Sequence, residues 1–372
     1  MKDRDDKEDF PLREEVASFT VGLTRYLDRE GNATGQLPSF ALQADELQAM
    51  YRSMVLTRSF DAHAVALQRT GRLGTYASSL GQEAVSTGLA MAMGQDDILV
   101  PSFREHGAQL LRGVAMEELF LYWGGDERGS DFRDQPLDFP VSVTVGGHAP
   151  HATGLAMALQ IRGCNNAVVC VIGDGATSKG DVYEAMNFAG VRAAPVVFVI
   201  NNNEWAISTP RNSQSAATTL AQKAIAAGIP GEQVDGNDVI AVRDRVGAAL
   251  DSARAGEGPA VIEALTYRLA DHTTADDASR YRDDAETSSR WEFEPVLRLR
   301  RYMENAGHWN SDQEQALLAD CEERVGRAAA AYLDSAPQAP ETMFDYLYAS
   351  LPADLLAQRA RVAARGEAAA DD

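Results

Sequence analysis

The stretch IGDGATSKGDVYEAMNFAGVRAAPVVFVINNN, residues 172–203, decides the fold class of this 372-residue chain. An apolar run, AVVCVI, ends just before Gly-Asp-Gly at residues 173–175, and a second, APVVFVI, ends at the asparagines 201–203. A helix-compatible stretch beginning at Asp181 separates the two runs. The pattern predicts a strand–helix–strand unit of a parallel sheet. Ligands of such units collect at the carboxyl ends of the strands, where both polar turns would lie as neighbours.

The polar residues at these strand ends suit a magnesium-diphosphate site. Asp174 offers a carboxylate and the asparagine run offers an amide oxygen. These are too few ligands to enclose a metal, but they suit Mg²⁺, whose octahedral shell is completed by water and by phosphates of a ligand. Gly173 and Gly175 would let the backbone approach those phosphates, and the following helix offers free N–H groups. By itself, Gly-Asp-Gly is more often an ordinary strand-to-helix turn.

The two halves of the pattern and their flanks carry a family resemblance. GDGATSKGDVYEAMNFAG, from residue 173, and NNNEWAISTP, from residue 201, resemble the alpha subunit of the thiamine-diphosphate-dependent decarboxylating component of 2-oxo acid dehydrogenase complexes. The similarity extends from about residue 41 to residue 307. It implies a three-layer α/β fold with a central, mostly parallel sheet flanked by helices and a helical C-terminal extension. It also implies thiamine diphosphate and Mg²⁺ as cofactors.

The resemblance implies the cofactor contacts residue by residue. Mg²⁺ would be held by Asp174, Asn203 and the backbone carbonyl of Trp205. Backbone groups of Val143 and Val145 would bind the aminopyrimidine ring, so their side chains carry no information about it. The full cofactor-binding set implied in this way is Phe103, Arg104, Val143, Val145, Gly173, Asp174, Gly175, Ala176, Asn203 and His272.

Arg104 has the chemistry to bind a diphosphate. It follows a predicted short strand, and a guanidinium can hold phosphate oxygens with two parallel hydrogen bonds. Without the resemblance, a surface arginine paired with Glu105 would be an equal alternative. The family usually has Tyr-Arg at this place. Phe103 keeps the aromatic ring but lacks the hydroxyl, which puts one phosphate hydrogen bond in doubt.

His272 is the catalytic candidate. It opens the polar segment 268–290, and a histidine in a loop near a diphosphate can donate to phosphate or act as a general acid near pH 7. The resemblance places such a histidine at the cofactor phosphates and the active-site channel. In several members the next residue is a phosphorylated serine. Thr273 stands there in this chain and leaves such control open.

The chain departs from the family at two places. Some members have a histidine in the loop that corresponds to ERGSDFRDQPLDFP, which has none. Whether His148 or His151 compensates, or merely packs at the start of a helix, stays open. In the text TYASSLGQEA, Tyr76 and Ser79 occupy positions where we expect substrate selectivity to be decided.

Composition limits the class of protein. The net charge of −21 argues against binding to nucleic acid or to acidic membranes, and no apolar stretch approaches the roughly 20 residues of a membrane span. Cys164, Cys170 and Cys321 are odd in number and lack metal-ligand spacing. The acid-rich N-terminus lacks the apolar core of a signal peptide. We therefore expect a protein of the reducing cytoplasm.

Four regions are expected along the chain: an extended arm (1–40), a thiamine-diphosphate-binding α/β domain (41–307), a helical extension (308–360) and a disordered tail (361–372). The alternation of strands and helices predicts an α/β fold. Helices are expected in residues 45–71, 113–121, 150–162, 216–228, 239–255, 295–306 and 312–333. Further strands are expected near residues 98–101, 233–234 and 259–267.

The resemblance implies an oxidoreductase of the pyruvate dehydrogenase (acetyl-transferring) type. A 2-oxo acid would be decarboxylated with thiamine diphosphate, and the acyl group would pass to a lipoyl group on a separate acyltransferase. The glutamate that activates the cofactor in this family belongs to a beta subunit. Since one cofactor-binding half is visible here, we expect an α₂β₂ heterotetramer.

Pyruvate is the favoured substrate, because TLAQKAIAAGIPGEQVDGND and HTTADDASRYR resemble bacterial pyruvate-type subunits. The alternatives are branched-chain 2-oxo acids such as 3-methyl-2-oxobutanoate, and acetoin. A non-catalytic paralogue is a further alternative. The presence of Asp174, Asn203, Arg104 and His272 argues against it, since such paralogues tend to lose metal ligands.

Overall fold

The computed structural model of the chain describes residues 15–370. Most of its secondary structure is helical. The helices are α1 (Ala44–Arg69), α2 (Glu83–Ala92), α3 (His106–Arg112), α4 (Met116–Trp123), α5 (Ala149–Arg162), α6 (Gly180–Arg192), α7 (Arg211–Gln214), α8 (Gln222–Ala226), α9 (Val239–Arg254), α10 (Asp284–Arg290), α11 (Pro295–Asn305), α12 (Ser311–Leu333) and α13 (Ala353–Ala370). The strands are β1 (Leu23–Thr24), β2 (Ile98–Val100), β3 (Val168–Gly173), β4 (Val196–Asn202), β5 (Trp205–Ala206), β6 (Thr209–Pro210), β7 (Gly231–Asp235) and β8 (Ala260–Leu265).

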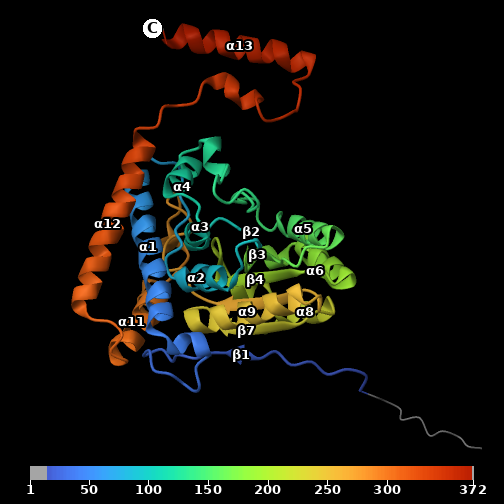
Figure 1. Cartoon of the computed structure of the whole chain (residues 1–372), viewed down its shortest axis with the longest axis vertical. Helices are drawn as coiled ribbons and strands as arrows, with labels where there is room; N and C mark the ends of the chain where they lie inside the picture. The colour runs from blue at the N-terminus through green and yellow to red at the C-terminus, as the bar shows by residue number, and fades with distance from the viewer. Residues whose placement is uncertain (1–14, 371–372) are drawn as a thin grey trace, which may run out of the picture.

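A six-stranded sheet forms the centre of the molecule (Figure 1). Its strand order is β1-β7-β8-β4-β3-β2, and every pairing is parallel. Strands β3 and β4 are adjacent, with Gly173 paired with Asn201. The predicted neighbouring of the two polar strand ends is therefore confirmed. A separate antiparallel pair, β5 and β6, follows β4.

Side chains of β3 alternate between the two faces of the sheet, as the period of a strand requires. Val168, Cys170 and Ile172 pack with residues of α5, α6 and α8. Val169 and Val171 pack with residues of α2, α3 and α9 on the opposite face. Both faces are covered, which explains why the central strands are apolar without interruption. These are the three layers that the sequence predicts.

A further layer of long helices lies outside α2 and α9. Helices α1 and α12 run side by side, and α11 joins them around a core that includes Leu47, Met50 and Leu299 (Figure 1). Helix α12 is capped at its N-terminus by Asn310, whose side chain accepts hydrogen bonds from the backbone N–H groups of Asp312 and Gln313. Helix α13 stands apart from this body at the end of an extended segment (Figure 1).

The ends of the chain differ from the expectation in part. The predicted N-terminal arm lies outside the described residues up to residue 14; beyond them, β1 adds to the edge of the sheet beside β7. The tail predicted to be disordered from residue 361 is instead helical to Ala370. Runs of alanine and arginine have high helix propensity, which the disorder prediction underweighted.

Two predicted helices also differ. The helix expected at 113–121 is divided, because Gly113 adopts φ +99° and ends α3 before α4 begins. The helix expected at 216–228 contains only the short α8. There the Ala221 N–H donates to the buried Glu263 carboxylate at 2.9 Å, a tertiary contact that replaces local helix formation.

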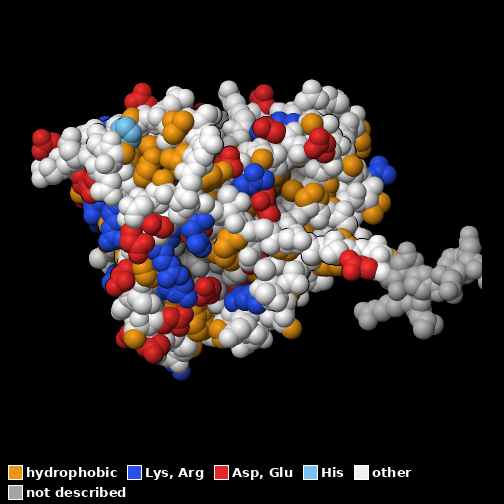
Figure 2. Space-filling view, turned by 90° about the horizontal axis from the view of Figure 1, so that it is seen from below, with side chains coloured by type: hydrophobic (Ala, Val, Ile, Leu, Met, Phe, Trp, Pro, Cys, Tyr) orange, Lys and Arg blue, Asp and Glu red, His pale blue; other side chains and the backbone are white. Residues whose placement is uncertain are grey.

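Basic and acidic side chains are mixed on the surface shown in Figure 2. The chain also forms surface ion pairs, such as Arg243 with Glu46 at 2.7 Å and Arg245 with Glu232 at 3.0 Å. On this face the acidic side chains are therefore dispersed among basic ones rather than gathered in one acidic patch. None of the helices in residues 15–370 is both long and apolar enough to cross a membrane.

Candidate functional site

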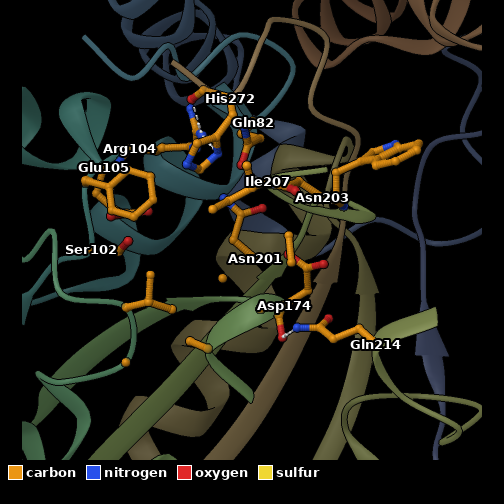
Figure 3. A pocket seen from close by; sticks show the side chains of 18 of the residues that line it. Gln82, Ser102, Arg104, Glu105, Asp174, Asn201, Asn203, Ile207, Gln214 and His272 are labelled. Carbon is orange, nitrogen blue, oxygen red and sulfur yellow. Dashed lines mark hydrogen bonds between the residues drawn. The ribbon is translucent and has the colours of Figure 1, made fainter. Parts of the chain in front are cut away.

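A cavity of about 210 Å³ lies where the carboxyl ends of β2, β3, β4 and β8 converge (Figure 3). Each of these strands is followed by a polar segment that turns into the cavity. All of the predicted cofactor and metal residues except Val143 line it. The lining residues from that set are Phe103, Arg104, Val145, Gly173, Asp174, Gly175, Ala176, Asn203, Trp205 and His272.

Asp174 is the acidic group at the end of β3. Its side chain is 2% exposed, and its Oδ2 atom is buried without a hydrogen-bond partner in the described part of the chain. Burial raises the pKa of the carboxyl to about 6, although backbone hydrogen bonds from Gly175 and Asp174, and then the charges of Arg268 and Arg104, oppose the shift. A buried carboxylate oxygen without a partner is costly unless a cation compensates it. This group is therefore ready to accept a positive ligand.

Asn203 follows β4 and faces the same cavity. Its Oδ1 accepts the Trp205 N–H at 3.2 Å, and its Nδ2 donates to Gln82 Oε1 at 3.0 Å. The amide oxygen keeps a second lone pair. The backbone carbonyl of Trp205 accepts one hydrogen bond from Arg268 at 3.2 Å and likewise has a second lone pair. Asp174, Asn203 and Trp205 thus bring the predicted oxygen donors to one cavity.

Arg104 is buried, at 5% exposure, and does not form a surface ion pair. Its Nη2 donates to the backbone carbonyl of His272 at 2.7 Å, and its guanidinium lies 5.1 Å from the centre of the Phe103 ring. Glu105 instead accepts the backbone N–H of Arg104, at 3.3 Å. Burial, followed by the charge of the neighbouring Arg268, lowers the pKa of Arg104 to about 10. The guanidinium remains charged at neutral pH.

His272 lies between two guanidinium groups. Its Nδ1 is 3.1 Å from Arg104 Nη2 and 3.5 Å from Arg268 Nη1. Since guanidinium nitrogens only donate, Nδ1 must be the acceptor and the ring proton must be on Nε2. Burial, followed by Arg104 and Arg268, lowers the pKa of His272 to about 4. The ring is therefore neutral near pH 7 and offers Nε2–H as a donor.

The loop after His272 folds back on itself. The His272 N–H donates to Asp276 at 2.9 Å, and the Tyr281 hydroxyl also donates to this carboxylate. Arg282 donates to backbone carbonyls of the strand exit, including that of Ala270 at 3.2 Å. The acidic and Tyr-Arg elements of the loop thus fix the backbone that carries His272.

Tyr76 and Ser79, the predicted selectivity residues, do not line the cavity. Both are fully buried and hydrogen-bonded to Asp61, Tyr76 Oη at 2.9 Å and the Ser79 N–H at 2.7 Å. Ser78 donates to the same carboxylate, and its backbone carbonyl accepts from Arg104. Tyr76 and Ser79 therefore lie behind Arg104, and their role in substrate selectivity stays a prediction.

The structure shows which of the two histidines, His148 or His151, reaches the site. His148 lines the cavity and is 5% exposed; its Nε2 is 2.7 Å from the Val171 carbonyl, and its Nδ1 is buried without a partner among residues 15–370. His151 is exposed, and its Nδ1 is 3.0 Å from the carbonyl of Gly147. His148 is therefore the one that faces the site. Val143, which is 59% exposed, stays outside it.

Comparison with known proteins identifies the family to which the chain belongs. The Dehydrogenase E1 component family matches residues 51–341, more than half of the chain. The chain belongs to this family. Pyruvate dehydrogenase E1 component subunit alpha of Staphylococcus aureus (strain Mu50) is 38% identical over 337 residues, covering 90% of this chain and 91% of the relative. The proteins of the same name from Mycoplasma pneumoniae and Acholeplasma laidlawii are 37% identical over 91% of this chain and 94% of the relative, and 43% identical over 78% and 84%.

Sequence reasoning missed several polar residues in and around this E1 component site, among them Arg268 and Gln82. Arg268 is fully buried between Trp205 and His272, and Gln82 lines the cavity beside Asn203. An arginine directly after an apolar strand, close to a loop histidine, was a signal that could have drawn attention to Arg268. The quoted GQEA text contains Gln82, but only the tertiary arrangement brings it to the strand ends.

Proposed function

We propose that this chain is the alpha subunit of a thiamine-diphosphate-dependent pyruvate dehydrogenase E1 component. The observation that carries the proposal is that one cavity at the strand ends is lined by the Asp174 carboxyl, whose Oδ2 atom has no partner in the described residues, and by the buried cation Arg104. A bound diphosphate needs cations and a bound Mg²⁺ needs an anion, and this cavity has both. The names of the relatives favour pyruvate as the substrate.

The cavity fits a magnesium-bound diphosphate. Asp174, Asn203 and the carbonyl of Trp205 would hold Mg²⁺, which prefers oxygen ligands and keeps several places for water and phosphate. A Cβ atom at Gly173 would meet no protein atom within 4 Å, so the backbone there leaves room for a ligand. Residues 15–370 contain no cluster of three or more His, Cys, Asp and Glu side chains for a metal. A site that shares its metal with a diphosphate does not require one.

Thiamine diphosphate bound here would supply the electron sink that a 2-oxo acid needs to lose CO₂. The residues of the chain bind and orient it. Arg104 would bind the diphosphate, and Arg268, buried behind Trp205 and His272, would add positive charge near it. His272 would donate a hydrogen bond through Nε2–H to a phosphate oxygen or act as a general acid. Asp276 and Arg282 hold the backbone that positions His272. Backbone groups of Val143 and Val145 would meet the aminopyrimidine ring.

The proposed partners are a beta subunit, in an α₂β₂ heterotetramer, and a lipoyl-bearing acyltransferase. Helices α5 and α6 pack together and leave apolar side chains outward: Ile161 is 82% exposed, Phe188 44% and Val191 73%. Small residues along α5, such as Ala152 and Ala156, allow close packing of these helices. The outward apolar side chains support a partner on this side of the molecule.

The substrate test uses the chain co-expressed with its beta subunit. CO₂ release is measured from pyruvate and from 3-methyl-2-oxobutanoate, and acetoin cleavage is measured in parallel. We expect pyruvate to give the highest kcat/KM and acetoin no cleavage. A preference for 3-methyl-2-oxobutanoate would change the assigned substrate but not the proposed cofactor site. Absence of all three activities in an assembled complex that binds thiamine diphosphate would favour a non-catalytic paralogue.

His272→Gln should reduce proton uptake when the cofactor binds. The free site holds the pKa of His272 at about 4, and a diphosphate placed beside the ring would raise it. At pH 6 the wild-type ring would therefore gain up to about one proton that the variant cannot gain. Calorimetric titrations in two buffers of different ionisation enthalpy measure this difference. Equal proton uptake would place His272 away from the phosphates.

The loop of residues 270–290 should be cut more slowly by trypsin in the presence of Mg²⁺ and thiamine diphosphate. Its hydrogen bonds are internal and polar, and few apolar side chains anchor it. Contact between His272 and a phosphate would add an anchor at one end. Cleavage at Arg280 and Arg282 is followed by mass spectrometry, with Arg359 in α13 as an internal reference. Equal protection at both places would contradict ordering of the loop by the cofactor.

A further inference from the structure

Gln82 has a position in the cavity that neither the family match nor the names of the relatives explain. It immediately precedes α2, is 1% exposed, and lines the cavity between Asn203 and His272 (Figure 3). Gly81 makes this possible. It adopts φ +88°, and a Cβ there would lie 2.4 Å from the Tyr267 carbonyl, so only glycine lets the chain approach the end of β8 this closely.

The backbone before α2 is also held in place by hydrogen bonds to a buried carboxylate. The Gly81 N–H donates to Glu83 at 3.0 Å, and Arg58 donates to the same fully buried carboxylate at 2.8 Å. Gln82 therefore has little freedom to move away from the strand ends. Its side chain points to the cavity because its neighbours on both sides are fixed.

A chain of hydrogen bonds determines how the Gln82 amide is oriented. The Trp205 N–H can only donate, so the atom of Asn203 facing it must be Oδ1. This orientation turns Asn203 Nδ2, also a donor, toward Gln82, which must then present Oε1. The remaining amide atom, Gln82 Nε2, is buried with no hydrogen-bond partner in the described residues. Gln82 thus carries two N–H donors on the wall of the cavity, and none of the described residues places an acceptor within hydrogen-bond distance of them.

We propose that Gln82 is a positioning and ligand-binding residue of the cofactor site: Nε2–H donates to a phosphate oxygen, and Oε1 holds the Asn203 amide with its oxygen toward the divalent cation. This inference rests on the proposed function. A buried N–H group without an acceptor is unfavourable, and an anionic oxygen is the acceptor that satisfies it best. Gln82 lies on the side of Arg104 and His272, which would face the same phosphates (Figure 3).

The chain offers a matched control. Gln109, on α3, is also 1% exposed, and both of its amide atoms lack partners within residues 15–370, but it does not line the cavity. Gln→Met at either position removes a buried amide and keeps a side chain of similar shape. A difference between Gln82→Met and Gln109→Met is therefore a measure of ligand contact rather than of packing.

The experiment titrates thiamine diphosphate into the co-purified complex with the beta subunit at saturating Mg²⁺, followed by calorimetry. Gln82→Met should raise the Kd about 10- to 100-fold, as expected for a lost hydrogen bond to a charged group. Gln109→Met should leave the Kd within about threefold. Gln82→Glu can still accept the Asn203 Nδ2–H, but it replaces the donor with a carboxylate. Its Kd should rise at least as much as that of Gln82→Met.

The outcomes separate this inference from the proposed function. A wild-type complex that does not bind thiamine diphosphate would overturn the proposed function and the inference with it. Wild-type binding with an unchanged Kd in Gln82→Met, or an equal loss in Gln109→Met, would overturn the role of Gln82 alone. Tighter binding by Gln82→Glu would do the same, because a donor to phosphate cannot be replaced by a negative charge.

Discussion

Asp174→Asn is expected to stabilise the cofactor-free complex at pH 7.5 while abolishing its binding of Mg²⁺ and thiamine diphosphate. Burial raises the pKa of Asp174 from its ordinary value of 3.8 to about 6, so the folded chain binds this proton more tightly than the unfolded chain. Stability from this group is therefore full below pH 3.8, declines as the pH rises to about 6, and stays low above it. A neutral asparagine removes the penalty.

The expected gain in stability follows from the size of the shift. A pKa difference of about two units corresponds to about 3 kcal/mol, and we expect about 1–3 kcal/mol in the free energy of unfolding because the site partly relaxes. Binding is lost because Asp174 is the one ionised ligand proposed for Mg²⁺. Thermal unfolding at pH 4 and pH 7.5 measures the first effect, and calorimetric titration measures the second. The stability gain should be absent at pH 4.

Asp238→Asn is the matched control. Asp238 is also fully buried with a raised pKa, but its carboxylate accepts backbone N–H groups, including those of Tyr26 and Leu27 at 2.7 Å. Both of its oxygens accept backbone N–H groups, and the amide nitrogen of asparagine cannot accept them. The lost hydrogen bonds outweigh the removal of the charge, so stability should fall and cofactor affinity should not change. If Asp174→Asn behaved like Asp238→Asn in both measurements, the assignment of Asp174 to the metal would be wrong.

The sheet was predictable because its signal is local. Strands β3, β4 and β8 are apolar runs buried on both faces, and each ends at a polar residue or at the last position before one. The adjacency of β3 and β4 follows from the short helical connection between them. Asp174 and Asn203 could therefore be placed in one site from the sequence, since both are attached directly to strand ends.

The remaining parts of the site depend on tertiary contacts between distant segments. Gln82 reaches Asn203 across 121 positions, and Arg104 reaches His272 across 168. No local pattern encodes the order of six parallel strands, and this order brings the four segments together. Tyr76 shows the same dependence on tertiary structure. Its place in the text TYASSLGQEA does not reveal that its hydroxyl donates to Asp61 behind Arg104.

The isolated chain is expected to turn over no 2-oxo acid, and addition of the beta subunit is expected to restore turnover. The groups that Asp174, Asn203, Arg104 and His272 present are suited to the metal and the diphosphate. The glutamate that acts on the aminopyrimidine is expected on the partner. The aminopyrimidine itself would meet backbone groups of Val143, which is 59% exposed and so lies where a second subunit can cover it.

The test measures CO₂ release from pyruvate with an artificial electron acceptor at saturating Mg²⁺ and thiamine diphosphate. The chain alone should give no rate above background, and the rate should rise with added beta subunit until the two chains are equimolar. Asp174→Asn mixed with the beta subunit should assemble, as seen by gel filtration, but stay inactive, which assigns the turnover to this cavity. Robust turnover by the chain alone would overturn the subunit assignment, because a complete active site would then lie within a single chain.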